Sequence, residues 1–113
     1  MNDNPVIAAL RVARERERAR ARRRDARRRH AALAARLLVM PGREAKALVQ
    51  RARDAVNRWE RERLCSKHYI SRWRARLAGP VRRVAMALLD EGDWTDALLQ
   101  NTPWSFALGP AAA

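Results

Sequence analysis

A helix-forming segment with no apolar face is the feature that most limits how this chain can fold. Residues 6–40 contain neither glycine nor proline, and arginine and alanine, both strong helix formers, dominate them. Between Arg11 and His30 there are eleven arginines against three acids, and on a helix they fall on all sides of the axis. A helix that is polar all round cannot be a core element, so we expect this segment to project, bridge or fray.

The excess of positive charge is a stronger signal than the choice of arginine. Of the 25 cationic side chains, 23 are arginine, which GC-rich codon usage alone can explain, but 25 cations stand against only 12 acids. Residues 1–40 carry a net charge of +8, residues 41–89 carry +9 and residues 90–113 carry −4. This distribution indicates a polyanionic partner and does not by itself define a fold.

Helix signals divide the rest of the chain. Asn4-Pro5 is typical of an N-cap followed by proline at the first helical position, and Pro41-Gly42 interrupts the helical pattern. The first helix of the bundle, an amphipathic one, is expected from about residue 44 to residue 63, on the spacing of Ala45, Leu48, Val49, Ala52, Val56 and Trp59.

Three shorter elements follow. Ser66 can cap a helix that carries Tyr69, Ile70, Trp73 and Leu77, and Gly79-Pro80 ends it. A third helix begins at Val81 and closes at Gly92, and Asp93 can cap a short fourth one with Trp94, Ala97 and Leu98, which Thr102-Pro103 ends.

The predicted fold is therefore all-α. It has a basic helical arm over residues 1–40, a compact bundle of three to four short helices over 43–106, and a frayed tail over 107–113. The bundle has few large apolar side chains for its size, and such small domains are marginally stable. Docking of Leu33–Met40 onto the bundle would add buried area, and a homodimer is a second way to add it.

Catalytic and metal chemistry find little support. Cys65 and His68 are three residues apart, but a zinc site needs about four ligands and the only other histidine, His30, lies inside the arginine run. The chain has no glycine-rich phosphate loop. We expect no enzyme activity, no metal and no cofactor.

Localisation is predicted from cysteine usage and hydropathy. The single cysteine excludes an internal disulfide framework and is typical of a reducing cytoplasm. There is no apolar run of about 18 residues and no secretory signal, so we expect a cytoplasmic protein without a membrane partner.

Nucleic acid, DNA or RNA, is the expected partner, because arginine-rich segments bind phosphate and become ordered on binding. The predicted phosphate contacts in the arm are Arg14, Arg16, Arg18, Arg20, Arg22, Arg23, Arg24, Arg27, Arg28 and Arg29. The predicted extension of this surface on the bundle is Arg72, Arg74, Arg76, Arg82 and Arg83.

Two further hypotheses concern the bundle. A helix-turn-helix across Ser66–Leu89 would present Arg82 and Arg83, although a plain helical hairpin explains the same pattern. Trp59 and Trp73 lie on apolar stripes and are expected in the core. Trp104 and Phe106 follow the last helix, where they can fold back as a lid or form part of a partner surface.

One stretch carries a resemblance. It comprises Cys65-Ser66-x-x-Tyr69-Ile70-x-x-Trp73, then Pro80, then Trp94-x-x-Ala97-Leu98-x-Gln100-Asn101-Thr102-Pro103-Trp104. This stretch resembles small uncharacterised accessory proteins of proteobacteria and their phages and plasmids. The resemblance implies an accessory protein of a mobile element. It also implies an alternative function, a protein-binding inhibitor or adaptor, such as an anti-defence protein, that acts on a host or element-encoded protein through the bundle.

Overall fold

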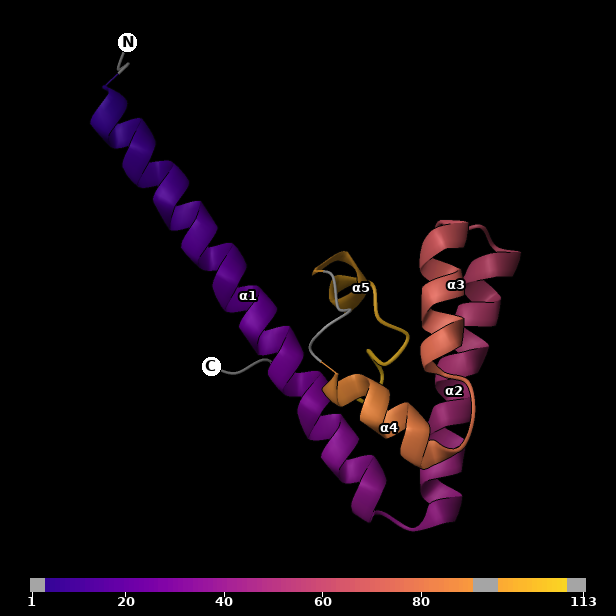
Figure 1. Cartoon of the computed structure of the whole chain (residues 1–113). Coiled ribbons are helices and arrows are strands. Elements are labelled where there is room, and N and C mark those ends of the chain that lie inside the picture. The colour runs from indigo at the N-terminus through magenta and orange to yellow at the C-terminus, as the bar shows by residue number, and fades with distance from the viewer. Residues whose placement is uncertain (1–3, 91–95, 110–113) are drawn as a thin grey trace.

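Five helices make up the fold, in a computed structural model that describes residues 4–90 and 96–109 (Figure 1). They are α1 (Pro5–Val39), α2 (Gly42–Arg61), α3 (Lys67–Arg76), α4 (Val81–Leu89) and α5 (Asp96–Gln100). No strand occurs among the described residues, so the all-α prediction is confirmed.

The helix ends follow the local signals of the sequence. The side chain of Asn4 accepts a hydrogen bond from the Val6 N–H at 2.9 Å, and the Ser66 hydroxyl accepts one from the Tyr69 N–H at 3.3 Å, so both predicted N-caps are confirmed. Gly79 follows α3 with a φ of +89°, a left-handed conformation that glycine favours. The predicted end at Gly92 and the cap at Asp93 lie outside the described residues.

Helix α1 consists of two parts with different surroundings. Residues 5–25, which we call the projecting segment, extend beyond the other helices (Figure 1), and most of their side chains are exposed. The later part packs against α4 and α5 and buries His30, Leu33, Ala34 and Leu37. The docking expected of Leu33–Met40 is therefore observed, and it begins earlier, at His30.

The core lies where α1, α2, α3 and α4 meet. Helix α4 packs against the other three, and α2 turns a stripe of four small apolar side chains inward, namely Ala45, Val49, Ala52 and Val56. The Trp73 ring is fully buried, and Trp59 is half-buried against the same cluster, in line with the core positions expected for both.

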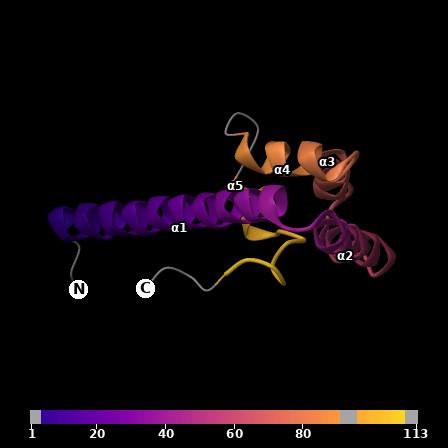
Figure 2. The same cartoon turned by 90° about the horizontal axis from the view of Figure 1, so that it is seen from below.

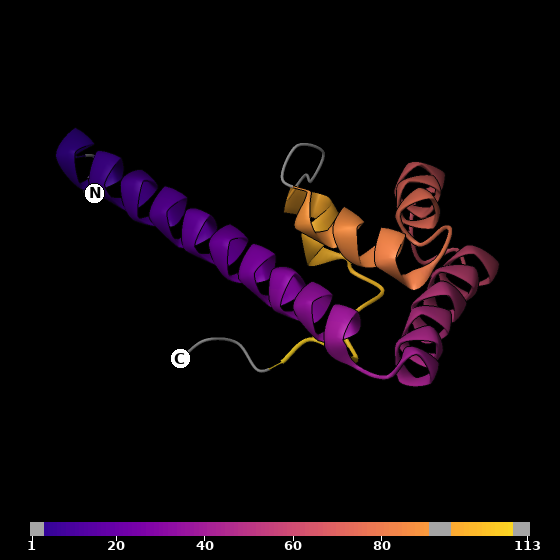
Figure 3. The ribbon, with the colours of Figure 1, turned by 60° about the horizontal axis from the view of Figure 1, so that its bottom comes forward.

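The segment after α5 runs back between α1 and α2, as Figure 3 shows. In the view of Figure 2, this C-terminal segment, residues 101–109, lies on one side of α1 and α4 lies on the other. The Arg36 Nη1 donates to the Ala107 carbonyl oxygen at 3.0 Å, and the Arg29 Nη2 donates to the Gly109 carbonyl oxygen.

These contacts differ from the frayed tail expected over 107–113. Ala107 and Leu108 are half-buried against the core instead. The carbonyl groups of this segment have no helix or sheet to satisfy them, and arginines of α1 supply the donors. Residues 110–113 lie outside the described part of the chain.

A buried polar network joins α1 to the C-terminal segment. The Nδ1 of His30 lies 2.7 Å from the Ala26 carbonyl oxygen, which can only accept, so we infer that Nδ1 carries the proton. The Nε2 then accepts from the Thr102 hydroxyl at 2.9 Å, and the oxygen of that hydroxyl accepts from the Trp104 N–H at 3.1 Å. A neutral imidazole thus matches both of these partners.

Trp73 extends the network to α3. Its indole Nε1 donates to the Asn101 carbonyl oxygen at 3.0 Å. Its ring stacks on the imidazole of His30, with the two centroids 6.4 Å apart. Three elements far apart in the sequence are therefore held by one cluster of side chains.

Replacing Trp73 with alanine is expected to lower the free energy of unfolding by about 3–5 kcal/mol, because it leaves a cavity and removes the donor to Asn101. Urea unfolding followed by circular dichroism measures this loss. Met86→Ala on α4 is the matched control, since the Met86 side chain is 51% exposed and its loss should cost about 0.5 kcal/mol or less. Equal effects of the two variants would contradict the assignment of Trp73 to the core.

Acidification is expected to destabilise the fold through His30. Burial lowers the pKa of His30 below its ordinary value of 6.5, and the nearby Arg29 cation lowers it further, against an opposing effect of the Ala26 hydrogen bond. The unfolded chain therefore binds a proton first, so stability is full above pH 6.5 and falls as the pH drops towards the pKa of the folded state.

Thermal unfolding between neutral pH and about pH 5 checks this expectation, because His30 titrates in that range when the chain is unfolded. His30→Gln should show a flatter dependence of the unfolding midpoint on pH than the wild type. His68→Gln, on an exposed histidine at the start of α3, should keep the wild-type slope. A wild-type slope in His30→Gln would rule out His30 as the source.

Candidate nucleic-acid interface

The projecting segment is a strongly basic, exposed surface in the described part of the chain. It carries eight arginines against Glu15, Glu17 and Asp25. Within it only Ala19, Arg23 and Asp25 are half-buried, and the other side chains are exposed. Because the arginines fall on all sides of the helix, their guanidinium groups are accessible from several directions at once.

Mutual repulsion among these arginines is only partly offset. Glu17 pairs with Arg20 at 3.6 Å and with Arg24 at 3.2 Å, but all three side chains are more than half exposed, and such pairs contribute little. Like charges four residues apart, such as Arg14 and Arg18, each cost about 0.2–0.5 kcal/mol. A bound polyanion would turn this repulsion into attraction.

The structure places most of the predicted arm arginines on this exposed surface. Arg14, Arg16, Arg18, Arg20, Arg22 and Arg24 are exposed on the projecting segment, and Arg27 and Arg28 are exposed one turn further along. Arg23 is half-buried. The prediction that Arg29 contacts phosphate is corrected, because Arg29 is half-buried and its guanidinium donates to the Gly109 carbonyl oxygen of the C-terminal segment.

The five arginines predicted on the bundle have other surroundings. Arg74 donates to both carboxylate oxygens of Glu60, at 2.7 and 3.1 Å, and to Asn57 at 3.1 Å. The hydrogen bond from Arg74, together with its charge, lowers the pKa of the Glu60 carboxyl. Arg72 and Arg76 are half-buried, and Arg76 donates to the Arg72 carbonyl oxygen at 3.3 Å.

These bundle arginines do not continue the surface of the projecting segment. Helix α3, which carries three of them, packs against α2 and α4 and lies at the far side of the molecule from the start of α1 (Figure 1). Arg82 and Arg83 are exposed in the first turn of α4. Helix α4 packs against three other helices, α1, α2 and α3. The recognition helix of a helix-turn-helix must also leave one face free to enter the major groove.

The prediction that Trp104 and Phe106 form a partner surface is corrected, because both side chains pack against the bundle. Trp104 is 0% exposed, so it belongs to the core and not to a surface. Phe106 is half-buried, stacks on Trp104 with the centroids 6.1 Å apart, and lies under the Arg51 guanidinium at 4.1 Å. The C-terminal segment has therefore folded back onto the bundle, as the lid hypothesis expected.

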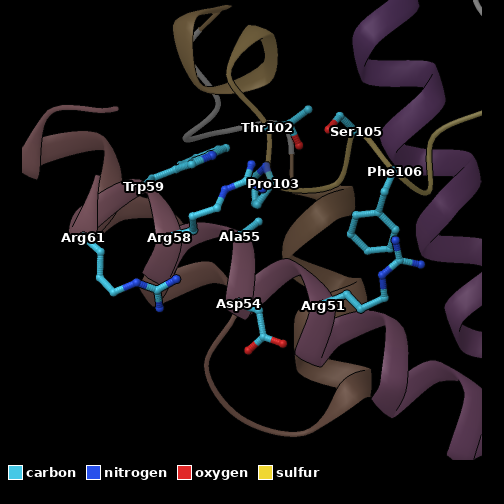
Figure 4. Close-up of a pocket in the computed structure, with 10 residues that line it drawn as sticks. All are labelled: Arg51, Asp54, Ala55, Arg58, Trp59, Arg61, Thr102, Pro103, Ser105 and Phe106. Atoms are coloured by element: carbon cyan, nitrogen blue, oxygen red, sulfur yellow. The ribbon is translucent and has the colours of Figure 1, made fainter. Parts of the chain in front are cut away.

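A basic and aromatic pocket lies between α2 and the C-terminal segment (Figure 4). Its volume is about 460 Å³. The lining residues from α2 are Arg51, Asp54, Ala55, Arg58, Trp59 and Arg61, and those from the C-terminal segment are Thr102, Pro103, Ser105 and Phe106. The lining thus combines three arginines, one carboxylate and two aromatic rings.

The sequence indicates only one wall of this pocket, the one formed by α2. Arg51, Arg58 and Arg61 lie seven and then three residues apart, a spacing that puts Arg58 and Arg61 next to each other on α2 and Arg51 two turns earlier. Phe106 and Pro103 are more than 40 residues away along the chain, and only the return of the C-terminal segment brings them to α2.

The comparisons with known proteins identify no protein whose function bears on this interface. No protein-family model, no curated protein and no solved structure matches this chain. Within residues 4–90 and 96–109, no group of three or more His, Cys, Asp or Glu side chains is placed to hold a metal ion. In the same part of the chain, no helix combines the length and the hydropathy needed to span a membrane.

Added salt is expected to stabilise the helix of the projecting segment in the free protein. The Debye length falls from about 30 Å at 0.01 M salt to about 8 Å at 0.15 M, so repulsion between arginines weakens. Amide hydrogen exchange of residues 8–25 should therefore become slower on addition of NaCl. The amides of Ala45–Val56 in α2 provide the control and should change much less. Faster exchange in α1 would contradict this account.

Proposed function

We propose that this protein is a small, non-enzymatic nucleic-acid-binding protein that binds the phosphate backbone through the projecting segment of α1. The observation that carries the proposal is a helical segment that extends beyond the other helices and carries seven exposed arginines. A folded domain gains nothing in packing from such a segment. Its surface chemistry fits a partner with closely spaced negative charges.

The dimensions of the segment suit a nucleic-acid groove. At 1.5 Å per residue its 21 residues span about 31 Å, close to one turn of duplex DNA at about 34 Å. The DNA major groove is about 12 Å wide and admits a helix. Arginines on every side of that helix can then reach both walls of phosphates, where the guanidinium fork pairs well with phosphate oxygens.

The expected binding is strong at low salt and weakly selective. Contacts to phosphate position a protein on nucleic acid but do not specify a base sequence. The attachment of the segment to a folded domain supports an accessory role, in which the arm holds nucleic acid near the domain. An origin in a mobile element, as the resemblance in residues 63–104 implies, fits such a role.

Titration of labelled duplex and single-stranded oligonucleotides at several salt concentrations tests the proposal. If about six to ten phosphates are neutralised, affinity should fall about 10³–10⁵-fold between about 50 and 200 mM salt. Replacing Arg14, Arg16, Arg18 and Arg22 with glutamine should lower affinity at every salt concentration. It should also reduce the slope of log K against log salt by about 0.9 for each phosphate that the variant no longer neutralises.

A second variant with the same loss of charge provides the control. Replacing the exposed residues Arg43, Lys46, Arg63 and Lys67 with glutamine removes four cations outside α1 and should have a clearly smaller effect. A flat salt response, or equal losses in the two variants, would contradict the proposal. One protein retained stoichiometrically in a nuclease-treated pull-down, with the α1 variant still retaining it, would favour a protein-binding inhibitor or adaptor instead.

A further inference from the structure

The pocket between α2 and the C-terminal segment has the chemistry of a nucleotide site. We propose that it binds one nucleotide of a single-stranded nucleic acid, with the base against the Trp59 ring and the phosphate on the neighbouring arginines of α2, Arg58 and Arg61. This inference rests on the proposed function, because it assigns the pocket to the same class of ligand. It adds a preference for single strands and a second site, away from the projecting segment.

Two aromatic side chains offer surfaces for a base. Trp59 and Phe106 are both half-buried, so each is anchored against the core while part of it lines the pocket. Figure 4 shows Trp59 at one end of the pocket and Phe106 at the other, with Pro103 between them. Stacking on an aromatic ring accepts every base, since each base has a π-face.

The cations lie beside these rings. Arg58 and Arg61 both come from α2 and are exposed at the pocket. Arg58 has one ion pair with Glu62, at 3.5 Å, in which both side chains are more than half exposed and readily exchange partners. Arg51 is already placed over the Phe106 ring, which leaves its guanidinium edge for a phosphate oxygen.

Asp54 limits what the ligand can be. Its carboxylate accepts a hydrogen bond from the Gln50 side chain at 2.9 Å, and in Figure 4 it points away from Trp59. The three arginines of the lining outnumber this one carboxylate, so the pocket still favours a phosphate over a cationic ligand.

The shape of the pocket favours a single strand. Its volume of about 460 Å³ lies within the range of small-molecule sites, about 300–1,000 Å³. A base inside a duplex is stacked and paired, so it cannot enter a pocket of this kind without leaving the helix. Single-stranded DNA and RNA both present free bases, so both are candidate ligands of the same chemistry.

Fluorescence anisotropy with labelled oligothymidine, oligouridine and a DNA duplex tests the inference on the full chain. Trp59→Leu should weaken binding of the single strands about 5- to 150-fold, the range for one base–aromatic stack, and leave duplex binding unchanged. Arg61→Gln should weaken single-strand binding more than Arg63→Gln, which removes an exposed cation outside the pocket lining. A labelled oligodeoxyuridine, which differs from oligouridine only in lacking the 2′-hydroxyl, distinguishes DNA from RNA.

Photocrosslinking keeps the test valid if Trp59→Leu does not fold. An oligonucleotide carrying 5-iodouracil should crosslink the wild-type protein at Trp59 or Phe106.

Crosslinks confined to α1, or equal losses of single-strand and duplex binding in Trp59→Leu, would overturn the inference while leaving the proposed function standing. Binding of single strands through the pocket alone, with no effect of the α1 variant, would refute the proposed function and support the inference. Absence of binding to every probe would overturn both.

Discussion

The hydrogen bond between His30 and Thr102 is the contact on which the arrangement of this protein depends. It links the middle of α1 to a residue 72 positions later, and through Trp104 and Trp73 it fixes both the C-terminal segment and α3. A buried polar group without a partner costs about 1–3 kcal/mol, so the network stabilises one register of α1 against the bundle and penalises others. This point anchors α1 to the bundle, and the projecting segment extends beyond it.

Arginine has three distinct uses in the fold. Arg29, Arg36 and Arg53 donate to backbone carbonyl groups at places where a segment has no regular partner. Arg74 forms a bidentate pair with Glu60. Seven of the eight arginines of the projecting segment are exposed to solvent. Composition counts all of these side chains alike, and only the surroundings of each one separate a structural donor from a cation available to a ligand.

The two proposed nucleic-acid sites differ in whether the sequence alone predicts them. The projecting segment follows from the sequence, because arginines on every side of a helix exclude burial regardless of the rest of the fold. The pocket at Trp59 does not, because its second wall comes from residues 102–106. The position of Trp104 after the last helix favours a surface location, yet the residue is buried because the chain returns between α1 and α2.

The sequence by itself determined the helices and their ends: the Asn4 and Ser66 caps, the break at Pro41-Gly42 and the glycine after α3 are local effects of a few neighbouring residues. It also indicated that the arginine run of α1 would not be a core element. Only the tertiary structure decided that His30, directly after the arginine run, is a core residue, and that Arg29 holds the C-terminal segment. Both depend on contacts with residues more than 70 positions away, and no local pattern specifies which distant carbonyl or hydroxyl group will complete a hydrogen bond.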